Sequence, residues 1–191
     1  MSALRPALER DGYVVVKGAI PDDLVEGALR RLNLEILRCG ITPEQIDEWK
    51  YATFWPSVRF EPEIVALREP LADLLEPQEG EVWGDAQLLL RFPDEAGDWP
   101  LTPHTDDLPE WADGRRYVAI AGVALSRSRA RDGCLAVWPG SQRGEEPDDV
   151  ELVELDAGDV VVMHPDLRHS STLNRGGSIR YAVYIRLLGA P

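Results

Sequence analysis

The chain has 191 residues, of which 44% are hydrophobic, so it is long and apolar enough to bury the core of one domain. Its 20 basic and 34 acidic residues give a formal net charge of −14, which argues against nucleic-acid or anionic-membrane partners, because both require a cationic footprint. The longest apolar run, residues 118–125, is far too short to span a bilayer, and the first residues lack the apolar segment of a signal peptide. We therefore expect a cytoplasmic protein.

The first 80 residues are expected to form helices around one early strand. The β-rich run at 13–20 predicts that strand, and it stops at a proline. Residues 21–40 begin with proline and two acids, end with glycine and carry apolar residues at helical spacing, which predicts a helix. Further helices are predicted over 42–49 and over 61–77, the second with a break at Pro70.

From residue 81 onward, short β-rich runs alternate with turn residues, which is typical of a β-sandwich, jelly roll or barrel. Because helices come first and strands later, the order argues against a doubly wound sheet. We predict one domain over 1–191, mainly β, in which residues 1–80 form a mostly helical support packed on one sheet of a jelly roll over 81–188. The predicted strands are 82–92, 115–125, 134–141, 150–155, 159–164 and 179–188.

His104 and Asp106, in the tripeptide HTD, form a candidate half of a metal site. Residues i and i+2 of a strand point to the same face, so the imidazole and the carboxylate could hold one ion. The third ligand would be His164 or His169, and two histidines with one carboxylate form the facial triad that suits Fe(II). The pair is a weak signal by itself, because the same tripeptide is compatible with a loop that contains an Asx turn.

Five segments of the chain carry a family pattern in the expected order. Together they resemble the phytanoyl-CoA dioxygenase-like family of Fe(II)/2-oxoglutarate-dependent oxygenases, over nearly the whole chain. Gln142 departs from this pattern, because it stands where the family's PGSH hairpin ends in histidine. The segments are DGYVVVKGAIPDDLV (11–25), HTD (104–106), DGCLAVWPGSQRG (132–144), AGDVVVMHPDLRHSSTLN (157–174) and RYAVYIRL (180–187).

The resemblance implies a cupin-like double-stranded β-helix, with Fe(II) as the metal and with 2-oxoglutarate and O2 as cosubstrates. It also distinguishes the two downstream histidines, since the family places an arginine about eleven residues after the distal ligand. Arg180 follows His169 at that spacing. The implied metal ligands are therefore His104, Asp106 and His169, and His164 is expected in the core or beside the ligands.

The same resemblance implies residues that bind the cosubstrate. The planar guanidinium of Arg180 is expected to hold the distal carboxylate of 2-oxoglutarate through two parallel hydrogen bonds. The Ser171 hydroxyl, two residues after the distal histidine, is expected to donate to the same carboxylate. Gln87 and Arg91 share a face of one predicted strand and are expected to contact cosubstrate or substrate, although a half-solvated strand has the same pattern.

Three further positions carry expectations about the substrate pocket, and a fourth is expected outside it. Trp111 and Arg143 are expected near the substrate, and Arg143 and Arg91 are the alternatives to Arg180 as the cosubstrate anchor. Gly122 is small where some relatives are bulky, which would widen the pocket. Arg186 is expected to be an exposed strand arginine.

The implied reaction is hydroxylation of a small organic metabolite, with release of succinate and CO2. Asp106 favours oxygenation, because halogenating relatives lack the carboxylate ligand. Desaturation, epimerisation or ring formation at the same site is an alternative, and so is a cupin-like metal-binding module without catalysis. The sequence specifies neither the substrate nor the oligomeric state.

Overall fold

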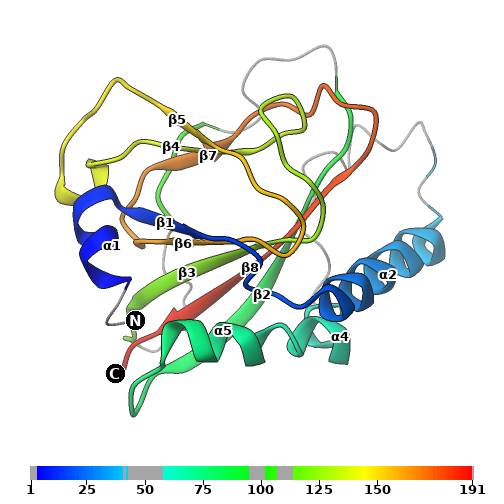
Figure 1. Ribbon diagram of the computed structural model, residues 1–191, viewed down its shortest axis with the longest axis horizontal. Helices are drawn as coiled ribbons and strands as arrows, with labels where there is room; N and C mark the ends of the chain where they lie inside the picture. The colour runs from blue at the N-terminus through cyan, green and yellow to red at the C-terminus, as the bar shows by residue number, and fades with distance from the viewer. Residues whose placement is uncertain (1–3, 41, 43–57, 95–101, 107–113, 191) are drawn as a thin grey trace.

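The structure is a computed structural model that describes residues 4–40, 42, 58–94, 102–106 and 114–190. Over these residues the chain forms two antiparallel sheets that face one another, with helices against the outer side of the larger sheet (Figure 1). The helices are α1 (Arg5–Asp11), α2 (Asp22–Cys39), α4 (Pro62–Val65) and α5 (Arg68–Leu75), with 3-10 turns η2 (Val58–Phe60) and η4 (Ser141–Arg143).

The larger sheet has five strands in the order β1-β6-β3-β8-β2, and the smaller has three in the order β5-β4-β7. Every strand pair is antiparallel, as expected for a jelly roll. The N-terminal strand β1 pairs with β6, so the early segment contributes to the sheet as well as to its helical cover. The strands are β1 (Tyr13–Val16), β2 (Val82–Arg91), β3 (Tyr117–Ala124), β4 (Leu135–Val137), β5 (Glu151–Val153), β6 (Val160–Met163), β7 (His169–Ser171) and β8 (Arg180–Leu188).

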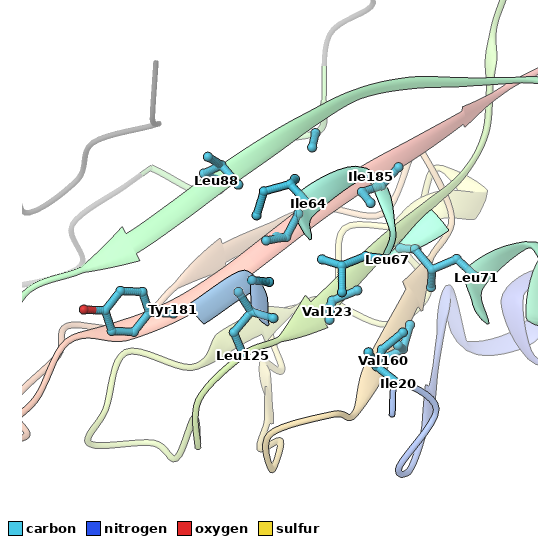
Figure 2. Packing of buried hydrophobic residues seen from close by; sticks show 14 of the residues in the cluster. Ile20, Ile64, Leu67, Leu71, Leu88, Val123, Leu125, Val160, Tyr181 and Ile185 are labelled. Atoms are coloured by element: carbon cyan, nitrogen blue, oxygen red, sulfur yellow. The ribbon is translucent and has the colours of Figure 1, made fainter. Parts of the chain in front are cut away.

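A first hydrophobic core lies between the large sheet and the helices α2, α4 and α5. Apolar residues of these helices pack against apolar residues from one face of strands β2, β3 and β8 (Figure 2). Burial of these apolar helix faces on the sheet stabilises the N-terminal half of the chain. Fully buried members include Leu32, Ile64, Leu71, Leu88, Val123 and Ile185.

Alternation along β8 separates this core from the site. Val183 and Ile185 face the helices, whereas Ala182 and Tyr184 belong to a second apolar cluster between the two sheets. Strand β2 alternates in the same way, because its even-numbered residues from 84 to 90 are buried and Gln87 and Leu89 are half-buried. Both strands therefore present polar side chains to the space between the sheets.

All seven predicted strands, including the early one at 13–20, and the helix over 21–40 are confirmed, and β7 and α1 are additional elements. The predicted helix over 61–77 is two helices, α4 and α5, and the break comes before Pro70. Pro70 lies in the first turn of α5, where its missing N–H removes no intrahelical hydrogen bond. The helix predicted over 42–49 lies outside the described residues except for Thr42. No helix in the described part of the chain is long and apolar enough to cross a membrane.

Candidate active site

His104 and His169 are placed side by side by the backbone. The segment 102–106 adds to the edge of β7 through an isolated antiparallel bridge between these two residues. The His104 N–H donates to the His169 carbonyl at 2.9 Å, and the His169 N–H donates to the His104 carbonyl at 2.8 Å. The two imidazole ring centroids are 4.7 Å apart.

The tautomer of both rings is fixed by local hydrogen bonds. In each histidine Nδ1 lies 2.9 Å from the backbone carbonyl two residues earlier, at Thr102 and at Leu167. A carbonyl only accepts, so Nδ1 carries the proton and Nε2 keeps its lone pair for a metal. Burial lowers the pKa of His169 below its usual value, although the Leu167 carbonyl and the Asp106 carboxylate oppose the shift. The buried ring is therefore neutral at pH 7, as a metal ligand must be.

Asp106 completes a cluster of three donor groups. Its Oδ1 lies 3.7 Å from His169 Nε2, and the ligand atoms of His104, Asp106 and His169 all lie within 4.8 Å of one another. Two imidazoles and one carboxylate on one side of an ion form the facial set that suits non-haem Fe(II). The residues present thus fit the metal that the sequence implies. His164 is not part of the cluster, and its Nδ1 accepts the Asp166 N–H at 3.1 Å.

Two buried arginines lie next to this cluster. Arg91 and Arg180 face each other across the β2–β8 pair, and both side chains are buried. Arg180 Nε donates to the Gly133 carbonyl at 2.9 Å, and Arg91 Nε donates to Ser171 Oγ at 3.0 Å. Burial lowers the pKa of Arg180, but an arginine stays charged in proteins. Among the described residues, no carboxylate lies within ion-pair distance of Arg180, in contrast to Arg186, which pairs with Asp106.

The metal cluster and the arginines line one cavity of about 60 Å³ between the two sheets. The structure thus brings together seven of the nine residues predicted for the site. Apolar side chains from β2, β4 and β8 cover the remaining wall. The lining consists of Gln87, Leu89, Arg91, His104, Asp106, Leu135, His169, Ser170, Ser171, Arg180, Tyr184 and Arg186.

Arg186 is the site residue that the sequence interpretation missed, because we expected it to be exposed. Its side chain is 13% exposed, and it donates to Asp106 Oδ2 from Nη2 at 2.5 Å and from Nε at 3.1 Å. Nη2 also donates to Gln87 Oε1 at 2.6 Å. The available signal was the even spacing of Arg180, Tyr184 and Arg186 along one strand, which places them on one face.

Two other expectations, those for Arg143 and Gly122, are changed by the structure. Arg143 lies outside the cavity, where its side chain pairs with Glu145 and donates to backbone carbonyls at the end of α1. Gly122 does not widen the pocket, because the Tyr184 ring occupies the space above it, with Cε1 2.6 Å from where a Cβ would be. Gln142 ties η4 to α1, since its Nε2 donates to the Glu9 carbonyl at 3.2 Å. Trp111 lies outside the described residues.

An outer groove of about 450 Å³ adjoins the cavity at Asp106. Its lining is mostly polar and includes His164. This histidine therefore lies near the metal cluster but outside it. Among the described residues, the exposed guanidinium of Arg116 has no partner. The other lining residues are Thr105, Tyr117, Val118, Pro165 and Asp166.

Comparison with solved structures finds the same fold. AviO1 from Streptomyces viridochromogenes Tue57 is 24% identical with a TM-score of 0.71, covering 100% of this chain and 96% of that one. EvdO2 from Micromonospora carbonacea var. aurantiaca, complexed with 2-oxoglutarate, is 16% identical with a TM-score of 0.71, covering 100% and 91%. The non-haem, alpha-ketoglutarate-dependent epimerase SnoN from nogalamycin biosynthesis is 21% identical with a TM-score of 0.65, covering 98% and 80%.

A comparison with the curated proteins finds no match. The family model described as phytanoyl-CoA dioxygenase (PhyH) matches residues 8–182, which include all of the metal cluster and both buried arginines. With that match, and with the jelly roll that carries the His-Asp-His cluster between its sheets, the chain belongs to the phytanoyl-CoA dioxygenase family of oxygenases.

Proposed function

We propose that the protein is a non-haem Fe(II)- and 2-oxoglutarate-dependent oxygenase that hydroxylates a small, polar organic molecule and releases succinate and CO2. The observation that carries the proposal is a combination within one cavity: three metal-binding side chains and a buried arginine without a carboxylate partner among the described residues. A bare metal site has no use for the second feature. A site that binds a dicarboxylate beside its metal requires both.

In this proposal His104, Asp106 and His169 hold the iron, which leaves three coordination positions open. When bound, the iron supplies the activation of O2, which is coupled to the oxidative decarboxylation of 2-oxoglutarate and leads to oxidation of the substrate. The protein's contribution is the arrangement of the ligands. Both imidazoles are held by backbone carbonyls, and the carboxylate is held by Arg186, so little reorganisation is needed when the metal binds.

Arg180 is proposed to bind the far carboxylate of 2-oxoglutarate. Nε of the guanidinium donates to the Gly133 carbonyl, and the side chain also hydrogen-bonds with Tyr184, which lines the same cavity. We propose that the Nη groups make a two-pronged contact with the carboxylate. Ser171 lies on the same face of β7 as His169 and lines the same cavity. Its oxygen already accepts from Arg91 Nε, so its own hydroxyl proton is directed elsewhere, and we propose that it donates to this carboxylate.

The outer groove is proposed to bind the substrate. It meets the cavity at Asp106, so a molecule held there lies beside the metal. Its guanidinium, imidazole and carboxylate groups, from Arg116, His164 and Asp166, favour a molecule rich in hydrogen-bonding groups over a hydrocarbon chain. A polar metabolite therefore fits better than a fatty acyl group.

A different oxidative outcome at the same site is the second candidate. It is favoured by the likeness to SnoN, which is an epimerase with the same fold. Which outcome occurs depends on how the substrate is held over the metal, since hydrogen removal is common to both. A non-catalytic metal-binding module is disfavoured by the buried Arg180. We also propose that residues 1–191 act as a single oxygenase domain, because β1 belongs to the large sheet.

The test is anaerobic titration of 2-oxoglutarate into the Fe(II)-loaded protein, followed by the metal-to-ligand absorption band. Appearance of the band, followed by succinate formation when air and small polar molecules are added, supports the proposal. Product analysis then distinguishes an added hydroxyl from an inverted stereocentre or a new double bond. Absence of any band in the Fe(II)-loaded protein would contradict the oxygenase function.

A further inference from the structure

We propose that Arg186 is a positioning residue that makes Asp106 a one-oxygen ligand, and that Gln87 holds Arg186 in place for this task. The inference rests on the proposed function, because it concerns the metal that His104, Asp106 and His169 would bind. It assigns a role to two polar cavity-lining residues that the proposed function leaves without one. It also replaces the expectation that Gln87 contacts cosubstrate or substrate directly.

The two oxygens of Asp106 have different partners. Oδ2 accepts two hydrogen bonds from one guanidinium, from Arg186 Nη2 at 2.5 Å and from Nε at 3.1 Å. Oδ1 is the oxygen near the histidines, 3.7 Å from His169 Nε2. The arginine therefore occupies the lone pairs of one oxygen, and the other oxygen remains for the metal.

The contact differs from an ordinary surface ion pair. The side chains of Arg186 and Asp106 are 13% and 15% exposed, so solvent screens their attraction only weakly. The third partner, Gln87, accepts from Nη2 at 2.6 Å, and the Tyr117 ring lies 5.7 Å from the guanidinium carbon. The arginine is thus held from three sides, which lowers the entropy lost when it binds the carboxylate.

Arg186 lies on an inner strand of the large sheet, so the strand that carries it is held on both sides. Strand β8 lies between β3 and β2, and Arg186 pairs with Ile120 of β3. Asp106, in contrast, belongs to the described segment 102–106, which adds to β7 through the bridge at His104. Through its two hydrogen bonds, Arg186 of this inner strand fixes the orientation of the Asp106 carboxylate.

Fixing one oxygen has a consequence for the metal. A carboxylate that binds through both oxygens takes two coordination positions, which would leave two of six beside the histidines. The facial triad has three open positions when the carboxylate binds through one oxygen. A chelating cosubstrate and O2 together need three. Arg186 thus keeps the third position open by holding Oδ2 away from the metal.

The closing experiment is anaerobic titration of Co(II) alone into the apo-protein, because Co(II) d–d absorption reports the coordination number as well as the affinity. In Arg186→Met we expect Co(II) affinity to fall by about 10–100-fold, as for other residues that orient a metal ligand. The band should also change in intensity as the freed carboxylate binds through both oxygens. Gln87→Leu should change affinity in the same direction by less, although it alters no charge.

Two further variants separate positioning from charge and from folding. Arg186→Lys keeps the charge but offers one point donor, so it should recover only part of the affinity. Arg30→Met removes an exposed charge on α2, 67% exposed in its pair with Glu26, and should leave the titration unchanged. Thermal melting of each apo-protein shows whether a variant is folded. If Arg186→Met does not fold, Gln87→Leu and Arg186→Lys still test the proposal.

The outcomes are distinct. Wild-type Co(II) affinity and spectrum in folded Arg186→Met would overturn the positioning role, and full recovery by lysine would reduce it to a charge effect and overturn it as well. Failure of the wild type to bind Co(II) in a manner that depends on His104 would instead contradict the proposed function itself.

Discussion

His104 and His169 exchange both of their backbone hydrogen bonds, at 2.9 and 2.8 Å, although they lie far apart in the sequence. In an antiparallel sheet, side chains of such directly opposed residues lie on the same face, which sets the two rings 4.7 Å apart. The backbone, rather than side-chain packing, therefore brings the two histidines together. The two histidine ligands thus meet where segment 102–106 adds to β7.

Replacing His104 or His169 should remove a metal ligand, whereas replacing His164, the third histidine of the chain, should not. For His104→Ala and His169→Ala we expect Fe(II) affinity to fall by more than about 100-fold, beyond the usual effect of residues that only orient a ligand. His164→Ala is the matched control, because its ring hydrogen-bonds within its own turn and lies outside the cluster. Anaerobic Fe(II) titrations measure all three. Abolished binding in His164→Ala with binding retained in His169→Ala would contradict the assignment.

Removing the carboxylate ligand should stop the reaction even where iron still binds. Asp106→Gly frees a coordination position and removes one negative charge, and it leaves the Arg186 guanidinium without its anionic partner. We expect a collapse of substrate-dependent succinate formation. Asp166→Gly, which removes a carboxylate that is 77% exposed in the outer groove, should retain the metal site. Wild-type succinate formation by the Asp106 variant would show that this carboxylate does not bind the metal.

Arg180 should determine 2-oxoglutarate affinity without affecting the metal. Leaving one member of a buried charge pair without its partner costs about 3–5 kcal/mol, which is roughly two to four decades of affinity at ~1.4 kcal/mol per decade. Arg180→Ala should show this loss with Fe(II) affinity nearly unchanged, and Arg180→Lys should recover only part of it. Arg143→Ala is the control, because that side chain lies outside the cavity. Anaerobic titration of 2-oxoglutarate measures the affinity, and equal affinity in the two alanine variants would identify another anchor.

Most of the elements follow from periodic patterns and turn signals, although β7 and α1 do not, whereas the choice of metal ligands follows from the resemblance to the family. The family's spacing of about eleven residues between the distal ligand and the arginine fits His169 and Arg180 but not His164. The structure places His169 in the cluster. Alternation in β2 likewise predicted that Gln87 and Arg91 share a face, and both line the cavity.

The partners of these side chains could not be predicted in the same way. Arg186 meets Asp106 because the segment that holds Asp106 adds to β7 of the opposite sheet, and no local pattern encodes that long-range pairing. The contact of Gly122 with Tyr184 depends on the register between β3 and β8, which pairs these two residues. Register is set by the whole sheet, so the sequence indicated a small residue but not the ring that occupies its space.

A side chain at Gly122 should disturb the cavity through Tyr184. A Cβ there would lie 2.6 Å from Tyr184 Cε1 and 3.0 Å from Val161 Cγ1, so a buried ring must shift. Gly122→Ala should therefore destabilise the fold by about 1–3 kcal/mol and weaken 2-oxoglutarate binding, because Tyr184 lines the cavity. Gly177→Ala is the matched control, since nothing lies within 4 Å of its added Cβ. Urea denaturation measures stability, and equal midpoints for the two variants would show that the ring moves freely.

Asp159 should make stability depend on acid pH. Its carboxylate, 5% exposed, joins the start of β6 to the segment after β1: Oδ2 accepts from Lys17 Nζ at 2.8 Å and Oδ1 from the Gly18 N–H at 2.9 Å. Burial alone would raise the pKa of this carboxyl, but the Lys17 contact and backbone N–H donors outweigh it, and the pKa lies below its usual value. A lowered pKa in the folded state means that the stabilisation is fully present above the unfolded-state value, near ~4, and is lost as pH falls through the folded-state value.

Asp159→Asn should therefore destabilise the protein at pH 7 by about 1–3 kcal/mol, because buried donors lose a charged acceptor. The difference from wild type should be constant above pH ~5 and shrink below pH ~4, where the wild-type carboxyl becomes protonated and resembles the amide. Asp11→Asn, which removes an exposed ion pair with Arg10, is the control and should change stability little at any pH. Urea denaturation between neutral and acid pH measures all three proteins. A difference between wild type and Asp159→Asn that does not narrow in acid would show that the contribution of Asp159 does not come from its charge.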